Sequence, residues 1–143
     1  MEVLQEVIHQ EELKDTGGVF IRIQVPAHRE WIYVDWIGYQ DEKRTKEGML
    51  KIIDVLSKYS ISRMLIDNRK QHGPYPKGID EWIFGTWLPK AIQIGLRFGA
   101  TILSSKIFAR LSADNLLRQE TGSLTYLNFE DENLAIQWLK NPS

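Results

Sequence analysis

The spacing of apolar residues changes along this chain, and no other feature constrains its fold as strongly. In the first third, apolar residues recur at every second position, the period of a strand with one buried face. The clearest series is Val19, Ile21, Ile23 and Val25. After Asp41 the repeat lengthens to three and four positions, the period of a helix, and these helical stretches alternate with short apolar runs. Strands followed by alternating helices and strands predict an α/β fold.

The first third predicts an antiparallel meander of three strands. The expected strands are a weak one carrying Val3, Val7 and Ile8, one at residues 19–25, and one at residues 31–37. A polar stretch and a turn at residues 15–18 end the first strand, because Asp and Gly favour turns. Gly38 closes the third strand, whose residues are largely aromatic and β-branched.

The rest of the chain predicts about four helices and three more strands. Helices are expected at residues 41–59, 80–97, 106–119 and 130–140, and strands at residues 63–67, 98–103 and 124–127. Asp41 and Asp80 are expected to cap the first two helices. Pro89, four residues after Gly85, predicts a kink in the second helix or its division into two short helices. Because parallel strands need right-handed crossovers, we expect a mixed sheet, with the meander beside parallel strands, in one domain spanning residues 1–143.

Composition excludes several classes of function. A formal charge of −1 gives no electrostatic case for binding nucleic acid. The absence of cysteine excludes disulfides, thiolate metal sites and cysteine nucleophiles, and it favours a cytoplasmic protein. Membrane insertion is not expected, since no apolar run approaches about 20 residues, and the first residues lack the pattern of a signal peptide. Neither a phosphate-binding loop nor a dinucleotide-binding glycine motif occurs, so no cofactor is expected.

The order of elements resembles the STAS domain of sulphate-transporter tails and of sporulation anti-sigma-factor antagonists. It looks more like the small standalone SpoIIAA-like proteins of bacteria whose role is unassigned. The segments that carry the likeness are Trp36-Ile37-Gly38-Tyr39, Leu65-Ile66-Asp67-Asn68-Arg69, Gly73-Pro74 with Trp82, Trp87-Leu88-Pro89-Lys90-Ala91, Leu103-Ser104-Ser105, Phe108-Ala109-Arg110-Leu111-Ser112-Ala113 and Ala135-Ile136-Gln137-Trp138-Leu139. The likeness covers residues 19–139 and implies a STAS-like fold with a regulatory binding role.

One motif of that family is missing from this chain. The family's antagonists carry a phosphorylatable Asp-Ser-Ser/Thr-Gly-type motif at the start of the helix that follows the strand equivalent to residues 63–67. The corresponding segment here is Lys77-Gly78-Ile79-Asp80-Glu81-Trp82, which contains no serine or threonine, and Thr86 lies inside the helix. The resemblance therefore does not extend to a phosphorylation switch or to sigma-factor regulation.

Polar side chains follow the ends of the predicted parallel strands. In open α/β sheets, ligands bind beyond the carboxyl ends of these strands. Asp67, Asn68 and Arg69 are expected at this edge, together with Ser104 and Ser105. The loop that leaves the same edge is longer than a strand–helix connection requires, a length typical of functional loops. Its candidate residues for binding a ligand or partner are His72 and Tyr75.

Two interpretations of this strand end are open. In one, Asp67, Asn68 and Arg69 form a polar cup for a small anion or a peptide, with the Arg69 guanidinium as a two-point donor. In the other, Asp67 and Asn68 accept hydrogen bonds from loop amides and Arg69 pairs with an acidic neighbour. Ser104 and Ser105 are similarly either nucleophiles or, because no Gly-x-Ser-x-Gly elbow surrounds them, parts of a helix cap.

The histidines and tryptophans give weaker signals. His9, His28 and His72 lie far apart without ligand spacing, so no metal site is expected, and a lone loop histidine is usually solvated. Trp87 and Trp82 lie on a helix that is apolar on most of its circumference. That pattern indicates either a core helix packed beneath the long loop, or a dimer interface or a groove for an apolar ligand.

Three functional hypotheses follow. The leading one is a non-enzymatic binding or regulatory module, a homodimer, that engages an unknown protein or small ligand through the C-terminal edge of the parallel strands. The second is a carrier of a small apolar ligand, suggested only by analogy with other proteins of this architecture. The third is a hydrolase-type enzyme using Asp67, His72 or Ser104, which requires two of these residues within hydrogen-bond reach. No catalytic constellation is visible, so no catalytic residue is assigned.

Overall fold

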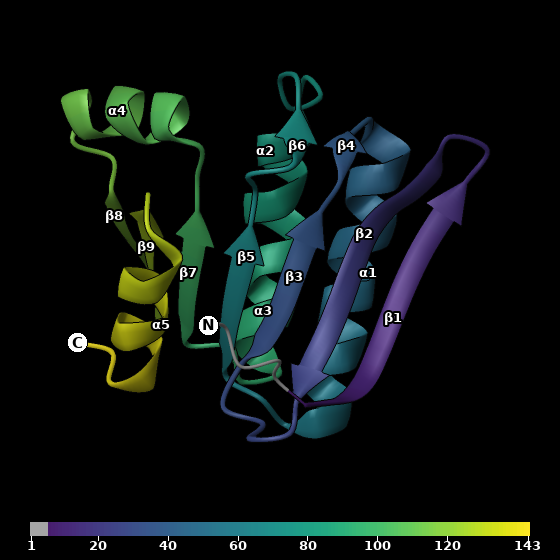
Figure 1. Ribbon diagram of the computed structural model, residues 1–143, viewed down its shortest axis with the longest axis vertical. Helices are drawn as coiled ribbons and strands as arrows, with labels where there is room; N and C mark the ends of the chain where they lie inside the picture. The colour runs from purple at the N-terminus through teal and green to yellow at the C-terminus, as the bar shows by residue number, and fades with distance from the viewer. Residues whose placement is uncertain (1–5) are drawn as a thin grey trace.

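The chain is built around one seven-stranded sheet, which a computed structural model describes for residues 6–143. The expected strand residue Val3 lies outside the described residues. In spatial order the strands are β1 (Val7–Asp15), β2 (Gly18–Pro26), β3 (Ile32–Trp36), β5 (Arg63–Asp67), β7 (Phe98–Ile102), β9 (Leu124–Phe129) and β8 (Arg118–Thr121). Neighbours are antiparallel from β1 to β3, parallel from β3 to β9, and antiparallel again between β9 and β8. The expected mixed α/β sheet, with a meander beside parallel strands, is confirmed (Figure 1).

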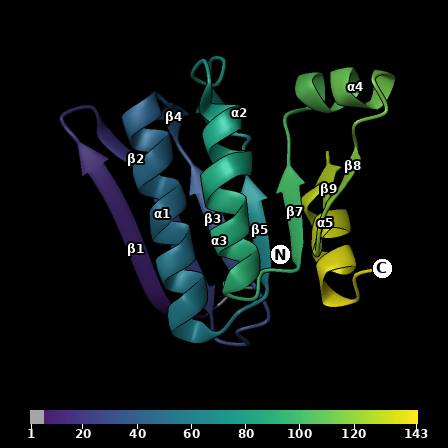
Figure 2. The ribbon, with the colours of Figure 1, turned by 180° about the vertical axis from the view of Figure 1, so that it is seen from behind.

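Helices cover both faces of the sheet, but unequally. They are α1 (Glu42–Tyr59), α2 (Ile79–Trp82), the π-helical turn η1 (Ile83–Trp87), α3 (Leu88–Gln93), α4 (Ser105–Ala113) and α5 (Glu132–Lys140). Helix α1 and the continuous helix formed by α2, η1 and α3 cover one face (Figure 2). Helix α5 lies on the other face and contacts β5, β7 and β9. Helix α4 lies beyond the edge at which the parallel strands end.

Two apolar cores result from this arrangement. The larger core, between the sheet and helices α1 and α3, contains fully buried side chains that include Phe20, Ile21, Ile23, Val25, Ile32, Val34, Ile52, Leu56, Ala91 and Leu96. The smaller core, beneath α5, consists of Trp31, Leu65, Ala100, Ile102, Ala135 and Leu139. Strand β2 shows how the sequence produces this division, because its alternate residues Ile21, Ile23 and Val25 are all inaccessible to solvent.

Among residues 6–143, no helix covers β1, β2 and β3 on the face that carries α5 (Figure 1). Polar side chains occupy it, and the strand register brings them into neighbouring pairs. Arg22 lies opposite Glu12 and donates from Nε to its carboxylate at 2.7 Å. Gln24 lies opposite Gln10 and donates to its side-chain oxygen at 2.8 Å. The alternation from Ile21 to Val25 therefore reflects one apolar face in the core and one polar face open to solvent.

Helix α1 begins where the sequence predicts. Asp41 is its N-cap, and its side chain accepts a hydrogen bond from the Arg44 backbone N–H at 2.8 Å. The helix packs closely on the sheet at Gly48, where an added Cβ would lie 2.4 Å from the ring of Trp36. Glycine at this position therefore lets α1 approach β3.

A kink or a division into two short helices was expected in the second helix, and a π turn before Pro89 separates its two α-helical parts. Its N-cap is Gly78, at φ 82°, rather than Asp80, and its last residue is Gln93 rather than residue 97. In η1 the Leu88 N–H donates to the carbonyl of Ile83, five residues earlier. This register accommodates Pro89, which has no N–H to donate to residue 85.

Two other expected boundaries are wrong. The helix expected at residues 106–119 ends at Ala113, and residues 118–121 form β8, which pairs with β9 in a hairpin. Strand β1 continues through its polar stretch to Asp15. In both cases a polar segment becomes a strand because pairing with a neighbour satisfies its backbone, which local composition does not reveal. None of the helices in residues 6–143 combines the length and apolar character needed to cross a membrane.

Candidate functional site

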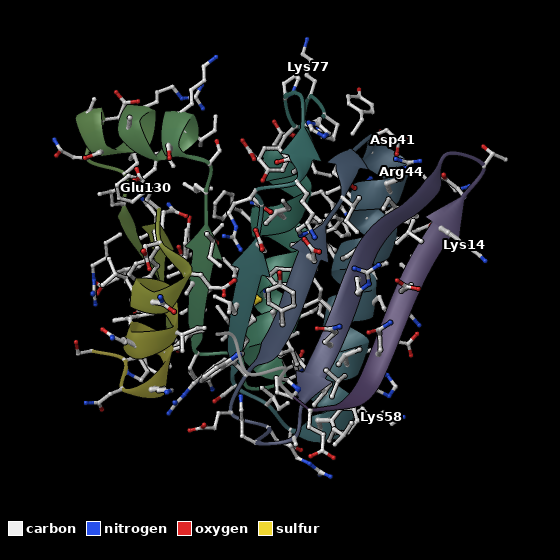
Figure 3. All side chains as sticks on the ribbon, viewed as in Figure 1. Lys14, Asp41, Arg44, Lys58, Lys77 and Glu130 are labelled. Atoms are coloured by element: carbon white, nitrogen blue, oxygen red, sulfur yellow. The ribbon has the colours of Figure 1, made fainter. Side chains whose placement is uncertain are left out.

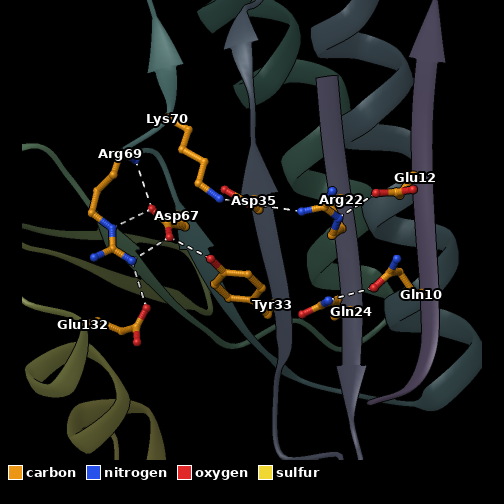
Figure 4. A network of polar contacts seen from close by, with 10 residues as sticks. All are labelled: Gln10, Glu12, Arg22, Gln24, Tyr33, Asp35, Asp67, Arg69, Lys70 and Glu132. Carbon is orange, nitrogen blue, oxygen red and sulfur yellow. Dashed lines mark hydrogen bonds and ion pairs between the residues drawn. The ribbon is translucent and has the colours of Figure 1, made fainter. Parts of the chain in front are cut away.

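Asp67 is the centre of a hydrogen-bonded network on the face that carries α5 (Figure 4). It is the last residue of β5, and only 2% of its surface is exposed. The Tyr33 hydroxyl on β3 donates to its Oδ2 at 2.7 Å. Arg69 donates from Nε to Oδ1 at 3.0 Å and from Nη2 to Oδ2 at 2.8 Å. The Arg69 backbone N–H also reaches Oδ1 at 3.0 Å, so Asp67 holds the loop that follows its own strand.

Arg69 connects this loop to helix α5. Its Nη2 donates to Oε1 of Glu132 at 2.9 Å. Glu132 is the first residue of α5, directly after the N-cap Asp131, whose side chain accepts a hydrogen bond from the Leu134 N–H at 3.1 Å. The network therefore joins the end of β5 to the beginning of α5. Of the two interpretations of the strand end, these contacts match the second, in which Arg69 pairs with acidic neighbours.

The electrostatics of the network keep each group in one charge state at neutral pH. Burial alone would raise the pKa of Asp67, but hydrogen bonds from Arg69 and Tyr33 and the charge of Arg69 outweigh it and lower that pKa. Burial, followed by the hydrogen bond to Asp67, raises the pKa of Tyr33. The hydrogen bond with Asp67 raises the pKa of Arg69. Asp67 is therefore ionised, Tyr33 is neutral and Arg69 is charged, and none is poised to exchange a proton.

A second buried carboxylate, Asp35, lies beside Asp67. The two are partners in the parallel register of β3 and β5, and Asp35 is also 2% exposed. Lys70 donates from Nζ to Asp35 Oδ2 at 3.0 Å, and Arg22 lies 3.9 Å from the same oxygen. Consecutive residues Arg69 and Lys70 therefore each neutralise one buried carboxylate. Because an unpaired buried charge is costly, these two ion pairs hold the loop after β5 against the sheet.

The structure brings Asn68 and Tyr75 together and leaves His72 apart. The Asn68 backbone N–H donates to the carbonyl of Ile102 at 2.9 Å, which ties the end of β5 to the end of β7. Its Nδ2 donates to the Tyr75 hydroxyl at 3.0 Å. His72 lies on β6 (Gln71–His72), which pairs in parallel with β4 (Gly38–Tyr39). Its side chain is exposed and forms no hydrogen bond with another described residue.

Ser104 and Trp87 have structural roles in the described part of the chain. Ser104 is the N-cap of α4, and its Oγ accepts a hydrogen bond from the Ile107 N–H at 3.4 Å. Ser105 is the first residue of α4 and is exposed. Trp87 is 2% exposed, and its Nε1 donates to the carbonyl of Met49 on α1 at 2.6 Å. Of the alternatives left open for Trp87, the contacts are those of a core helix.

An open hollow of about 160 Å³ lies beside the network, on the same face of the sheet. Its lining residues are Val7, Gln24, Pro26, Trp31, Tyr33, Leu65, Glu132 and Ile136. Tyr33 and Glu132 belong to both the hollow and the Asp67 network. The candidate site is therefore larger than the strand end and extends along β3 toward α5.

Tyr33, Asp35 and Glu132 are site residues that the sequence analysis did not identify. Tyr33 and Asp35 are two positions apart in β3 and therefore lie on one face of the strand, opposite the buried Val34. This spacing can be recognised in the sequence. No local signal connects them to Asp67, because Tyr33 precedes it by 34 positions. Glu132 follows Arg69 by 63 positions, and only the packing of α5 on β5 brings the two together.

No family model and no curated protein matches this chain. Among solved structures, it is similar to an uncharacterized protein of the DUF3478 family with a SpoIIAA-like fold from Shewanella loihica PV-4. The two are 14% identical, with 97% of this chain and 98% of that chain covered at a TM-score of 0.48.

Two structures of the anti-sigma factor antagonist SpoIIAA are also similar. The unphosphorylated form is 11% identical, with 79% of this chain and 92% of that chain covered at a TM-score of 0.49. The phosphorylated form of the Bacillus cell fate determinant SpoIIAA is 14% identical, with 82% and 96% covered at a TM-score of 0.46. The likeness to SpoIIAA-like proteins expected from the sequence is thus found among solved structures.

Proposed function

We propose that this chain is a non-enzymatic binding or regulatory module that engages a partner protein through the C-terminal edge of its parallel strands. We call the proposed contact region the strand-end surface and define it as Tyr39, His72, Tyr75, Lys77 and helix α4. Figures 1 and 2 both place these segments at the edge toward which β3, β5 and β7 run. The proposal includes a cytoplasmic setting, which the absence of cysteine favours.

The observation that carries the proposal is the exposure of helix α4. Its nine residues include Ile107, Phe108 and Leu111, yet none of its side chains is buried. These apolar side chains are half-buried, and Leu116, just after the helix, is exposed. A helix with a distinct apolar side normally buries that side against its own protein. Apolar side chains left uncovered on a helix are typical of a surface that contacts another protein.

Exposed aromatic residues at the same edge support the proposal. Tyr39 is 56% exposed and Tyr75 is 53% exposed. Tyrosine contributes a large, rigid contact area and is enriched at protein interfaces. Ion pairs of Arg69 and Lys70 hold the loop after β5, which leads to Tyr75, against the sheet. This part of the surface is therefore ordered before a partner binds, and the entropic cost of binding is lower.

The contacts give no support to the hydrolase hypothesis. It requires two of Asp67, His72 and Ser104 within hydrogen-bond reach of each other. In the described part of the chain, the side-chain partners of Asp67 are Tyr33 and Arg69, whereas Ser104 caps α4. A nucleophile beside a general base is therefore not assembled at this edge.

The carrier hypothesis is also poorly supported. The hollow beside α5 has a volume of about 160 Å³, whereas pockets for drug-sized ligands measure about 300–1,000 Å³. Trp87, which would line an apolar groove under this hypothesis, lies in the larger core. A lipid or similarly large apolar molecule would therefore not fit this hollow.

The homodimer remains part of the proposal. The continuous helix of α2, η1 and α3 carries one large apolar side chain, Phe84, that is 50% exposed. Of the two tryptophans on this helix, Trp87 is buried and Trp82 is half-buried against the larger core. A second copy of the chain that covers Phe84 would remove this side chain from water.

Site-specific photocrosslinking tests the partner-binding proposal. Lys77 and Lys58 are both exposed and lie at opposite ends of the molecule (Figure 3). A photoreactive benzoylphenylalanine is placed at residue 77 or, as the matched control, at residue 58, in the organism that encodes the chain. We expect an adduct of one defined mass from residue 77 that excess unlabelled protein competes away, and no such adduct from residue 58.

A double substitution sharpens this experiment. Tyr39→Ser combined with Tyr75→Ser removes exposed aromatic area and the hydrogen bond from Asn68 to Tyr75 without opening the core, so the unfolding midpoint in urea should fall only slightly while the adduct disappears. Identical adducts from both positions, an adduct that survives the double substitution, or no adduct from residue 77 would each contradict the proposal.

A further inference from the structure

The hollow beside α5 combines an apolar floor with polar groups at its rim. Trp31 and Leu65 belong to the smaller core and form part of the lining, together with Ile136 of α5. Gln24, Tyr33 and Glu132 supply the polar groups. In Figure 4, Tyr33 lies between Gln24 and Glu132. The hollow faces the uncovered side of β2 and β3, away from the strand-end surface defined above, so its occupancy does not depend on the proposed partner.

Most donors among the polar groups of the hollow bind acceptors within the protein. The Tyr33 hydroxyl donates to Asp67, and the Gln24 amide donates to Gln10. Glu132 accepts from Arg69 through Oε1 only. What remains among the described residues is one N–H of the Gln24 amide and three acceptors: the second oxygen of Glu132, the side-chain oxygen of Gln24 and the Tyr33 oxygen. A ligand that complements most of these atoms must donate hydrogen bonds.

The charges around the hollow also favour a ligand that donates hydrogen bonds and carries a positive charge. The cluster around Asp35 has no net charge. Its two positive side chains, Lys70 and Arg22, neutralise its two carboxylates, Asp35 and Glu12. At the rim, Arg69 is shared between Asp67 and Glu132, which leaves one negative charge in excess.

Size limits the ligand to a compact molecule. The volume of about 160 Å³ is close to that of an engineered protein cavity of roughly 150 Å³ that accommodates benzene. We propose that the hollow binds a small protonated amine that carries a compact apolar group, with its ammonium at Glu132 and its apolar group against Trp31, Leu65 and Ile136.

Titration of the ¹⁵N-labelled protein with benzylamine, followed by NMR, tests this site. Benzyl alcohol, a neutral molecule of similar shape, and benzoate, an anion, are the matched ligands. We expect saturable shifts for the amides of residues 24, 31–33, 65 and 132–136. Benzylamine should bind at least tenfold more tightly than benzyl alcohol, and benzoate should give no saturable shift.

Two substitutions identify the group that recognises the amine. Glu132→Gln removes the charge in the hollow, whereas Glu130→Gln removes the same charge from an exposed residue that does not line it. Glu132→Gln should abolish the tenfold preference for the amine, and Glu130→Gln should preserve it. Ile136→Trp, which fills the hollow from α5 and keeps Glu132, should weaken benzylamine binding at least tenfold.

Several outcomes would overturn the proposal. The first is that the NMR shifts fall on other residues or do not saturate. The second is that the protein binds benzylamine and benzyl alcohol with equal affinity. The third is that Glu130→Gln reduces the preference for the amine as much as Glu132→Gln does, which would show an effect of net charge alone. Unchanged binding to the Ile136→Trp protein would equally exclude the hollow, and this variant keeps the test decisive if Glu132→Gln perturbs the N-terminus of α5.

Discussion

Asp67 shows how one side chain can organise a strand end. Its two carboxylate oxygens accept hydrogen bonds from a tyrosine hydroxyl, a guanidinium and a backbone N–H. Each partner comes from a different position: Tyr33 from the neighbouring strand and Arg69 from the loop after β5 itself. A buried carboxylate with this many donors holds its surroundings in place, because removing it leaves the donors without an acceptor.

Replacing Asp67 should therefore destabilise the protein. In Asp67→Asn the charge is lost and Arg69 keeps only Glu132, so we expect the free energy of unfolding to fall by about 2 kcal/mol, as for hydrogen bonds to charged groups. Tyr33→Phe removes a single donor and should cost about 1 kcal/mol. Urea unfolding measures both. Asp114→Asn, an exposed control, should stay within about 0.5 kcal/mol of the parent protein. An Asp67→Asn protein as stable as this control would contradict the structural role.

Asp15 predicts a dependence of stability on pH. It receives two hydrogen bonds from Arg44, including one from Nε at 2.8 Å, and one from the Gly17 N–H at 2.8 Å. The hydrogen bond from Arg44, then that from Gly17, lowers the pKa of Asp15 from 3.8 to about 2. Because this pKa is lower in the folded state, the carboxylate contributes stability above the unfolded value of about 3.9, and the contribution is lost as the pH falls toward 2.

The Asp15→Asn variant isolates this contribution from other titrating groups. Thermal unfolding of both proteins should show the parent more stable at pH 7, by a margin that shrinks between pH values of about 4 and 2 and is absent below them. The quantity measured is the difference in stability between the two proteins. The effects of carboxylates that both proteins contain, such as Asp67, therefore cancel. A margin that does not change with pH would show that the charge of Asp15 contributes nothing.

At the scale of elements, the two long helices follow different local rules. Helix α1 is predicted well because its cap and its apolar spacing are both local. The helix from α2 to α3 is predicted only in outline, because Pro89 disrupts the α-helical hydrogen bonds and the chain restores the pattern through a π turn. An added Cβ at Gly85, within this π turn, would meet no atom within 4 Å.

Two glycines on these helices predict opposite effects of the same substitution. Gly48→Ala would place a Cβ 2.4 Å from the Trp36 ring, and we expect a loss of about 1–3 kcal/mol from overpacking despite the better helix propensity of alanine. Gly85→Ala meets no atom within 4 Å and should stabilise the protein by up to about 1 kcal/mol. Urea unfolding distinguishes the two. Equal effects would mean that α1 can move away from β3 without loss.

At the scale of the whole molecule, the proposed homodimer is tested by mass. Light scattering during size-exclusion chromatography should give about twice the 16.7 kDa of one chain. Phe84→Glu should return the protein to a monomer, because a charge would replace the exposed apolar side chain at the proposed contact. Leu134→Glu, at an apolar residue that is 56% exposed on α5, is the matched control and should leave the mass unchanged. A strict monomer at high concentration would exclude the dimer.

The sequence by itself determined the kind and order of most elements, because periodicity and caps are local properties. It identified the α1 cap at Asp41, the strand at residues 63–67 and the α/β class. It also placed Asp67 and Arg69 at a strand end, and the contacts there are among those it anticipated.

Only the tertiary structure decided which distant residues meet. The polar segments of β1 and β8 are strands because β2 and β9 pair with them, not because of their composition. Trp87 is buried in the larger core, where the Met49 carbonyl of α1 accepts a hydrogen bond from its Nε1. Glu132 reaches Arg69, and the hollow exists, because α5 folds back over β5. These contacts join positions far apart in the chain, and no local pattern of residues encodes them.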